Sequence, residues 1–361
     1  MSLQKTNLRY LPLVLLFTGM IVWSCRETYS PETEPQTPVV VVDAFISNEP
    51  GPYEVKLNLS VAYNATQDYP VVTNASVYVT DQNDHQYIFR EAYPGRYYSD
   101  KAEFRGVPGN TYTLHIETAS GQTIVSKPQL MPVEATIDSV YGMIDTREYI
   151  FTTGGVYTAK KVTGVQAFAD FSTTGDGAAR FRFSTTLVVG YVMTDHSTQP
   201  YPSIIYAWKK VNPLKSFNLT TEGTISNQQK ISRYDVCFFP VHEAFYQLAD
   251  TETITNWFLL VKPYALTEDA GKFYTAVNEQ LTTSNQIFDP IAAQVKGNLS
   301  CINQPLTNVF GFFEVSACSK KSFWVRALLG DNLAVFAPSV NIDSIPEKGR
   351  SVQEPPYFWR F

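Results

Sequence analysis

Apolar and polar residues alternate along several short stretches in the first third of the chain. Val55, Leu57 and Leu59 are separated by Lys56 and Asn58. A period of two places the apolar side chains on one face of a β-strand, so this stretch predicts a strand with one buried face. The same alternation, or a short apolar run, predicts further strands at residues 39–46, 75–79, 87–89, 112–116 and 123–125.

Turn-forming residues separate these strands at intervals of about ten residues. The turns are predicted at 48–52, 81–84, 94–95, 106–110 and 120–121. Short strands with this spacing are typical of an antiparallel sandwich of immunoglobulin-like type, which we predict for residues 39–132. The Cys-Trp-Cys core of antibody domains is missing from this stretch of sequence.

The rest of the chain, residues 133–361, is predicted to form a larger β-rich domain with one or two short helices. Thr267 is a good N-cap, and the acidic residues Glu268 and Asp269 suit the first turn of a helix. A shorter helix is expected at 241–249. Residues 131–139 are predicted to be a connection, and Lys262-Pro263 is expected to end a strand. Strands are predicted at 165–171, 180–191, 204–209, 235–239, 257–261, 310–317 and 323–326.

A hydrophobic leader precedes the first predicted strand. Lys5 and Arg9 give it a positive start, an apolar run extends from Leu11 to Trp23, and Cys25 follows the small residue Ser24. This pattern is typical of a secretory signal. The cysteine at its end predicts a lipoprotein, with residues 1–24 as signal peptide and residues 25–38 as a lipidated tether. The alternatives are an ordinary signal peptide and an uncleaved anchor.

Composition narrows the function classes. The net charge of −6 provides no basic footprint for nucleic acid. If Cys25 carries lipid, three cysteines are left. Cys301 and Cys318 could form a disulfide in an oxidising compartment, whereas Cys237 lies in an apolar run that favours a buried thiol.

The sequence predicts neither catalytic residues nor a cofactor or metal site. The four histidines are widely scattered, and HExxH, CxxC, EF-hand, GxSxG and phosphate-binding glycine motifs are all missing. Two pairs of residues could support catalysis: Cys237 with His242, and Asp170 with Asp176. However, Cys237 lies in an apolar run, and the two aspartates flank a predicted hairpin loop, where aspartate is common.

Aromatic side chains are the remaining candidates for binding a ligand or a partner, because ring faces stack on apolar surfaces. Aromatic residues make up 14% of the chain. In a β-rich protein they often fill the core instead, and both interpretations stay open. The candidates are Tyr201, Tyr206, Trp208, Tyr357, Phe358 and Trp359.

Sequence motifs in a fixed order run nearly from end to end of the chain. After Cys25 they are residues 41–48, 51–57, 74–79, 108–114, 137–141, 288–290, 297–298, 311–315 and 356–359. On these motifs the chain resembles the Bacteroidota outer-membrane lipoprotein family known as domain of unknown function 4249.

The resemblance implies a role without enzymatic residues. Genes of that family tend to lie beside TonB-dependent receptors. We therefore expect a non-catalytic protein, anchored to the outer membrane by lipid on Cys25, on the cell surface rather than the periplasmic face. It would be an accessory subunit or ligand-binding partner of such a receptor in nutrient uptake. The alternatives are a surface hydrolase acting on glycan or peptide, and a structural or adhesive envelope protein.

Overall fold

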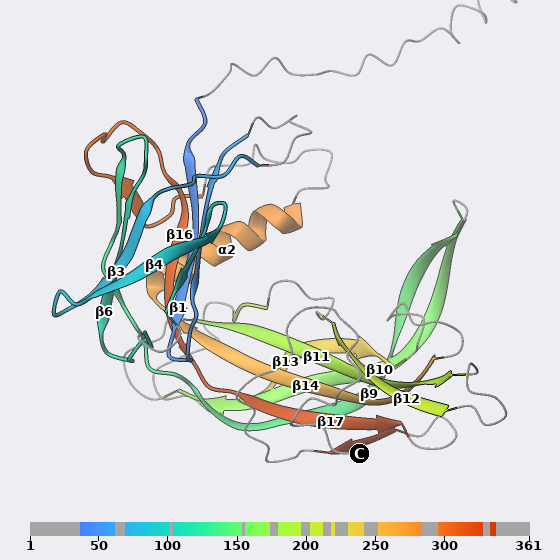
Figure 1. Ribbon diagram of the computed structural model, residues 1–361. Helices are drawn as coiled ribbons and strands as arrows, with labels where there is room; N and C mark the ends of the chain where they lie inside the picture. The colour runs from blue at the N-terminus through green and yellow to red at the C-terminus, as the bar shows by residue number, and fades with distance from the viewer. Residues whose placement is uncertain are drawn as a thin grey trace, which may run out of the picture. The chain divides into compact units, whose positions relative to one another are not determined.

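The computed structural model is dominated by β-strands, which confirms the predicted fold class (Figure 1). It describes residues 37–61, 69–100, 104–153, 156–173, 180–195, 203–211, 218–220, 230–241, 252–283, 295–327 and 333–336. The described residues from Pro38 onward belong to one compact unit. Within them, the strands form a 15-stranded sheet and a 3-stranded sheet.

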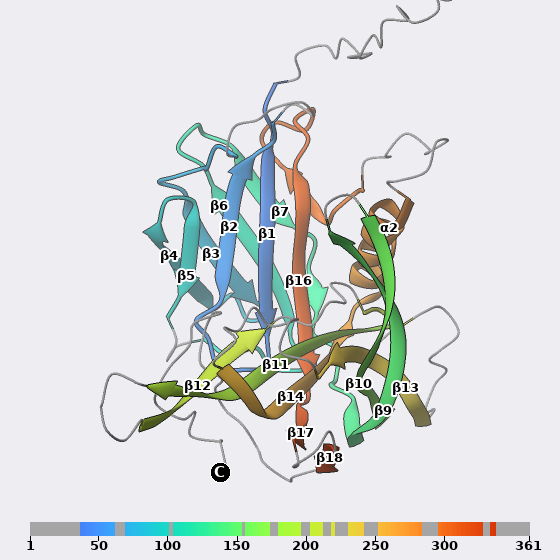
Figure 2. The same ribbon diagram turned by 90° about the vertical axis from the view of Figure 1, so that its right-hand side faces the viewer.

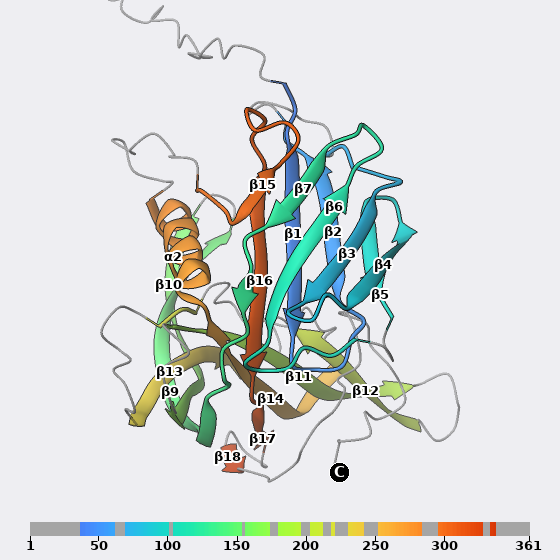
Figure 3. The same cartoon turned by 90° about the vertical axis from the view of Figure 1, so that its left-hand side faces the viewer.

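The first part of the large sheet folds over its own hydrophobic core. Neighbouring strands follow the order β1-β2-β5-β4-β3-β6-β7. Figure 2 shows β2 and β1 in one layer with β6 and β7 behind them, and Figure 3 shows the opposite face. The predicted alternation is confirmed, since Leu57, Val79 and Leu114 are completely buried. The strands are β1 Val40–Ser47, β2 Glu54–Leu59, β3 Ser76–Asp81, β4 Gln86–Tyr93, β5 Arg96–Ser99, β6 Thr111–Glu117, β7 Thr123–Ser126 and β8 Gln129–Leu130.

Two strands from late in the sequence join this sheet. β16 (Phe310–Cys318) pairs with β1 in parallel, and β15 (Leu299–Cys301) pairs with β7 in antiparallel orientation. Gly311 permits the close approach of β16, because its φ is +96° and an added Cβ would lie 1.8 Å from the carbonyl oxygen of Val42. The first core therefore includes residues from both ends of the chain. The domain boundary at residue 132 stays a prediction.

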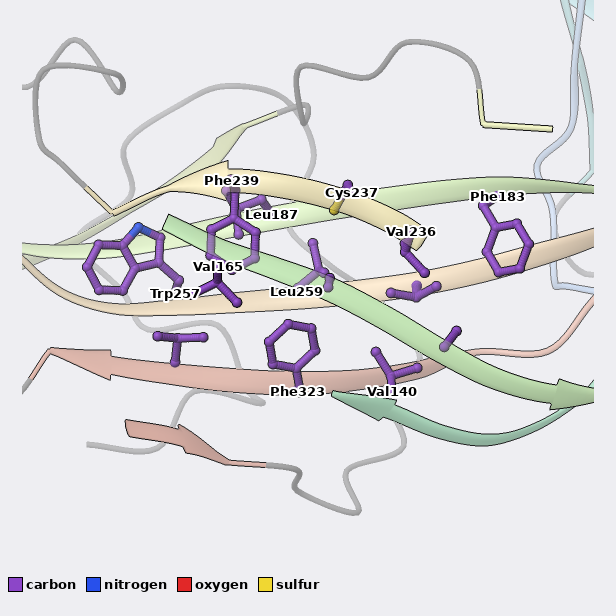
Figure 4. Close-up of a cluster of buried hydrophobic side chains, with 14 of the residues drawn as sticks. Val140, Val165, Phe183, Leu187, Val236, Cys237, Phe239, Trp257, Leu259 and Phe323 are labelled. Atoms are coloured by element: carbon purple, nitrogen blue, oxygen red, sulfur yellow. The ribbon is translucent and has the colours of Figure 1, made fainter. Parts of the chain in front are cut away.

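The remaining strands enclose a second hydrophobic core. β11 and β14 lie in the large sheet, whereas β13, β10 and β9 form the small one. Figure 4 shows side chains of both groups meeting in this core, with Cys237 and Phe239 on one side and Leu259 and Phe323 on the other. The strands are β9 Thr136–Thr153, β10 Val156–Ser172, β11 Arg180–Asp195, β12 Ser203–Val211, β13 Lys230–Pro240, β14 Glu252–Leu266, β17 Lys321–Ala327 and β18 Leu333–Phe336.

Several strand boundaries differ from the sequence prediction. Residues 136–139 belong to β9 rather than to a connection, and β9 and β10 form a hairpin far longer than the predicted strand at 165–171. β14 also continues through Lys262-Pro263. Along one edge of β14, β17 pairs with it up to Val261 and β16 pairs with it from Tyr264. Pro263 therefore lies in the gap between two partner strands, where its missing N–H breaks no ladder.

Helix α2 extends over Glu268–Thr283 and begins where the sequence predicted. The hydroxyl oxygen of Thr267 accepts a hydrogen bond of 3.2 Å from the backbone N–H of Ala270, which confirms the N-cap. Ala270 packs with Leu266 and Phe312 in a small separate cluster. A shorter helix was expected at 241–249, and residues 242–249 lie outside the described residues. The helices among the described residues include none long and apolar enough to cross a membrane.

Candidate functional site

A buried carboxylate occupies the face of β16 that points away from the first core. The Glu314 side chain is 2% exposed. Arg182 on β11 donates from Nη2 to both of its oxygens, at 2.8 and 3.1 Å. Ser316 Oγ donates to it at 2.7 Å, and the hydroxyl of Tyr274 on α2 donates as well. Two other elements, β11 and α2, therefore converge on Glu314 of β16. We call these four residues the Glu314 cluster.

Aromatic rings surround the cation of the cluster. The guanidinium carbon of Arg182 lies 4.8 Å from the ring centre of Tyr264 and 5.5 Å from that of Tyr274, distances at which a cation is attracted to a ring face. Burial opposes the charge on Arg182, but the negative charge of Glu314 outweighs it and raises the pKa of the guanidinium. Burial and Glu314 together raise the pKa of the Tyr274 hydroxyl. Arg182 therefore stays charged and Tyr274 stays neutral at physiological pH.

A second ion pair lies where the loop after β1 meets β14. Lys262 Nζ donates to the two carboxylate oxygens of Glu49 at 2.8 and 2.7 Å. The Tyr264 hydroxyl donates to the same carboxylate at 3.4 Å, and Lys320 lies 3.9 Å from it. This carboxylate is thus matched by two cations, which join the loop after β1 to β14 and to the residue before β17.

The same loop is held to the end of β16 by an amide group. Asn48 Oδ1 accepts a hydrogen bond of 2.8 Å from the backbone N–H of Cys318, and its Nδ2 donates to the Cys318 carbonyl at 3.1 Å. Burial and the charge of Glu49 raise the pKa of the Cys318 thiol to about 12. A thiol with such a pKa is not a thiolate at neutral pH, so it is a poor nucleophile.

These groups hold strands together rather than presenting reactive atoms. The carboxylates of Glu314 and Glu49 are both occupied by cations from other strands, and Asn48 clamps a backbone. Charged groups in such an arrangement bind one another and fix the positions of β1, β11, β14, β16 and α2. Within the described part of the chain, no three His, Cys, Asp or Glu side chains are grouped so that they could hold a metal ion.

Two of the predicted aromatic candidates lie among the described residues, and they differ in exposure. Tyr206 is 45% exposed on β12, whereas Trp208 on the same strand is buried. Trp208 therefore fills the interior, and Tyr206 is the ring of this pair that a ligand could reach. Tyr201, Tyr357, Phe358 and Trp359 lie outside the described residues, as does the predicted lipidation site Cys25.

The three described cysteines are buried and do not form a disulfide. Cys301 belongs to the first core, and its thiol donates to Asn303 Oδ1 at 3.3 Å. Cys318 is held by Asn48 near the second ion pair. The proposed pairing of Cys301 with Cys318 is thus not formed in the structure, because the two side chains occupy different surroundings. Cys237 lies in the second core, as its apolar run predicted.

The two ion pairs were not predicted from the sequence. A signal was present for one of them, since Glu314 interrupts the apolar run Phe312-Phe313-Glu314-Val315. A charge at a position buried in a strand requires a partner. Its partner Arg182 is 132 residues away in sequence, and no local pattern connects the two.

The fold and these contacts define the class: a mainly β protein in which partly buried ion pairs join β16 to β11 and the loop after β1 to β14. The model of the family Domain of unknown function (DUF4249) matches residues 26–322. The chain therefore belongs to this family, as the resemblance predicted. No curated protein and no solved structure matches it.

Proposed function

We propose that this protein is a non-catalytic lipoprotein of the outer membrane that serves as an accessory subunit or ligand-binding partner of a TonB-dependent receptor. The leader that ends at Cys25 carries the proposal. The family match supports it, since it begins at Arg26, directly after that cysteine. The cell surface is the proposed location.

The tether gives the anchored protein a limited reach. Residues 26–39 separate Cys25 from the first described strand, and a chain of that length spans at most about 50 Å. A protein held this close to a membrane receptor has a high effective concentration at it. A weak interface would then be occupied without a large contact area.

The occupied charges support a non-catalytic role. The carboxylates of Glu314 and Glu49 are bound to Arg182 and Lys262, respectively. The pKa of the Cys318 thiol is raised to about 12. Each of these groups stabilises the fold in its present state, and each would have to lose a partner or a proton before it could react. The proposal accordingly assigns them to structure.

Replacement of the anchor cysteine tests the lipid attachment. The variant Cys25→Ala should leave the folded body intact and lose its membrane partition after cell fractionation, with Cys237→Ala as a matched control that keeps it. Equal partition of both variants would refute the anchor.

For the partnership, cross-linked wild-type protein should be purified in mild detergent and its partners identified by mass spectrometry. Recovery of the chain without a TonB-dependent receptor would refute the partnership.

A further inference from the structure

The β9–β10 hairpin extends past the strand that supports it. β13 pairs with β10 only from Gly164 to Ser172, and the Val241 N–H donates to the Thr163 carbonyl at 3.2 Å. Residues 156–162 of β10 therefore pair with β9 alone among the described residues. The pairing is regular, without a register shift between Val156 and Asp170. At about 3.3 Å per residue, this two-stranded ribbon continues for about 25 Å beyond its support. Figure 1 shows it in green.

One face of the ribbon begins in the second core and continues into solvent. Cross-strand partners share a face, and Val165 pairs with Ile144. Val165 is completely buried, whereas Ile144 is 54% exposed. Farther out on this face, Ile150 is 72% exposed and Tyr157 is 77% exposed. Between these positions the face carries the pairs Thr146–Thr163 and Glu148–Lys161. It becomes apolar again at its outer end, where Ile150 and Tyr157 are exposed.

The end of the ribbon carries no charge, whereas its base carries charged side chains of both signs with one net positive charge. No charged residue stands between Glu148 and Lys160 in the sequence, and the segment holds Tyr149, Ile150, Phe151, Val156 and Tyr157. Arg147, Lys160 and Lys161 flank it. The Asp145 carboxylate lies 3.2 Å from Arg147, and Glu148 is the cross-strand partner of Lys161. The Lys160 ammonium lies 5.7 Å from the ring centre of Phe151, so the cation stays at the edge of the apolar segment.

We infer that this apolar end inserts into the boundary between headgroups and acyl chains of a membrane that contains anionic lipid. Apolar and aromatic side chains fit that boundary, and flanking Lys and Arg side chains reach the phosphates with their charged ends. The Lys160 ammonium, at the edge of the apolar segment, favours an anionic headgroup region over a neutral protein groove. A two-stranded ribbon is also marginally stable in water alone, so burial of its apolar end would stabilise it.

The inference adds a second contact to the lipid on Cys25 and rests on the proposed function in requiring that the protein sits at a membrane. Two weak membrane contacts on one chain hold far better than one. The insertion would also fix the rotation of the folded body relative to the bilayer. An acyl tether alone leaves that rotation open.

A fluorescent label on an introduced thiol tests the insertion in the full-length acylated protein. The cysteines in the described part of the chain are buried, and the thiol of Cys25 would carry lipid, so Ile150→Cys offers an accessible site for an environment-sensitive dye. Val107→Cys is the matched control, because Val107 is 50% exposed in the loop before β6. Both proteins are reconstituted into vesicles of phosphatidylethanolamine and phosphatidylglycerol, with and without a lipid-borne quencher.

The expected result is blue-shifted emission and quenching by the lipid-borne quencher at position 150, with neither at position 107. Adding Tyr157→Ser should weaken insertion about tenfold, as expected from the loss of one large apolar side chain. A dye at position 150 that stays in water would overturn the inference. So would a dye that a receptor shields but lipid does not quench. Flotation of the protein with the vesicles reports the anchor separately, so failed insertion leaves the anchor proposal standing.

Discussion

Removal of the Arg182 side-chain charge should strongly destabilise the fold. In Arg182→Met, the Glu314 carboxylate would stay buried and keep only the hydroxyls of Ser316 and Tyr274 as partners. Truncating one partner of a buried ion pair typically costs about 3–5 kcal/mol, because the other charge is left without compensation. Since the Arg182 side chain is 23% exposed, we expect the lower end, about 3 kcal/mol.

The assay is urea denaturation followed by tryptophan fluorescence. Lys56→Met is the control, because the 3.0 Å pair of Lys56 with Asp43 is exposed, at 36% and 69%, and such pairs contribute at most about 1 kcal/mol. The double variant Arg182→Met/Glu314→Leu should recover much of the loss, since replacing both members of a buried pair by apolar residues is often neutral.

Two results would refute this reasoning. If Arg182→Met loses no more stability than Lys56→Met, the buried carboxylate does not depend on its cation. If the double variant is as unstable as the single one, the loss comes from packing of the Arg182 side chain against Tyr264 and Tyr274 rather than from the charge left behind.

Two further variants test other contacts. Gly311→Ala should cost at least about 3 kcal/mol in the same denaturation assay, because the new Cβ would lie 1.8 Å from a backbone oxygen at a positive φ. The control Gly109→Ala has a φ of +87° but open space around it, and it should cost about 1–2 kcal/mol. Equal losses of stability in the two variants would exclude the clash. Burial tends to raise the pKa of Asp81, but hydrogen bonds from Asn83 and His85 outweigh it and lower that pKa. The resulting stabilisation is present above about pH 4 and disappears as the pH falls through the lowered pKa. Asp81→Asn should therefore be less stable than wild type at pH 7, and this gap should shrink as the pH falls below about 4. A gap that does not change with pH would contradict the assignment.

The sequence predicted those parts of the fold that depend on local pattern. Alternation identified β2 and β6, whose Leu57 and Leu114 are completely buried, and Thr267 identified the start of α2. Alternation says which face of a strand is buried but not which strand lies beside it. The parallel pairing of β1 with β16 was therefore beyond its reach. The outer part of β9–β10 was missed because it is exposed on both faces, so its sequence has no clean period of two.

The position of Glu314 explains why a buried charge is retained in an otherwise apolar strand. Phe313 and Val315 point into the first core, whereas Phe312 and Glu314 face α2 and β11. A slip of β16 by one residue against β1 would exchange the two faces and move the carboxylate into a core that holds no cation. Such a slip would leave an uncompensated buried charge, which is far more costly than a misplaced apolar side chain. The ion pair thus specifies the register of a strand that lines the first core on one face and the small cluster at α2 on the other, even where an apolar pair would give equal stability.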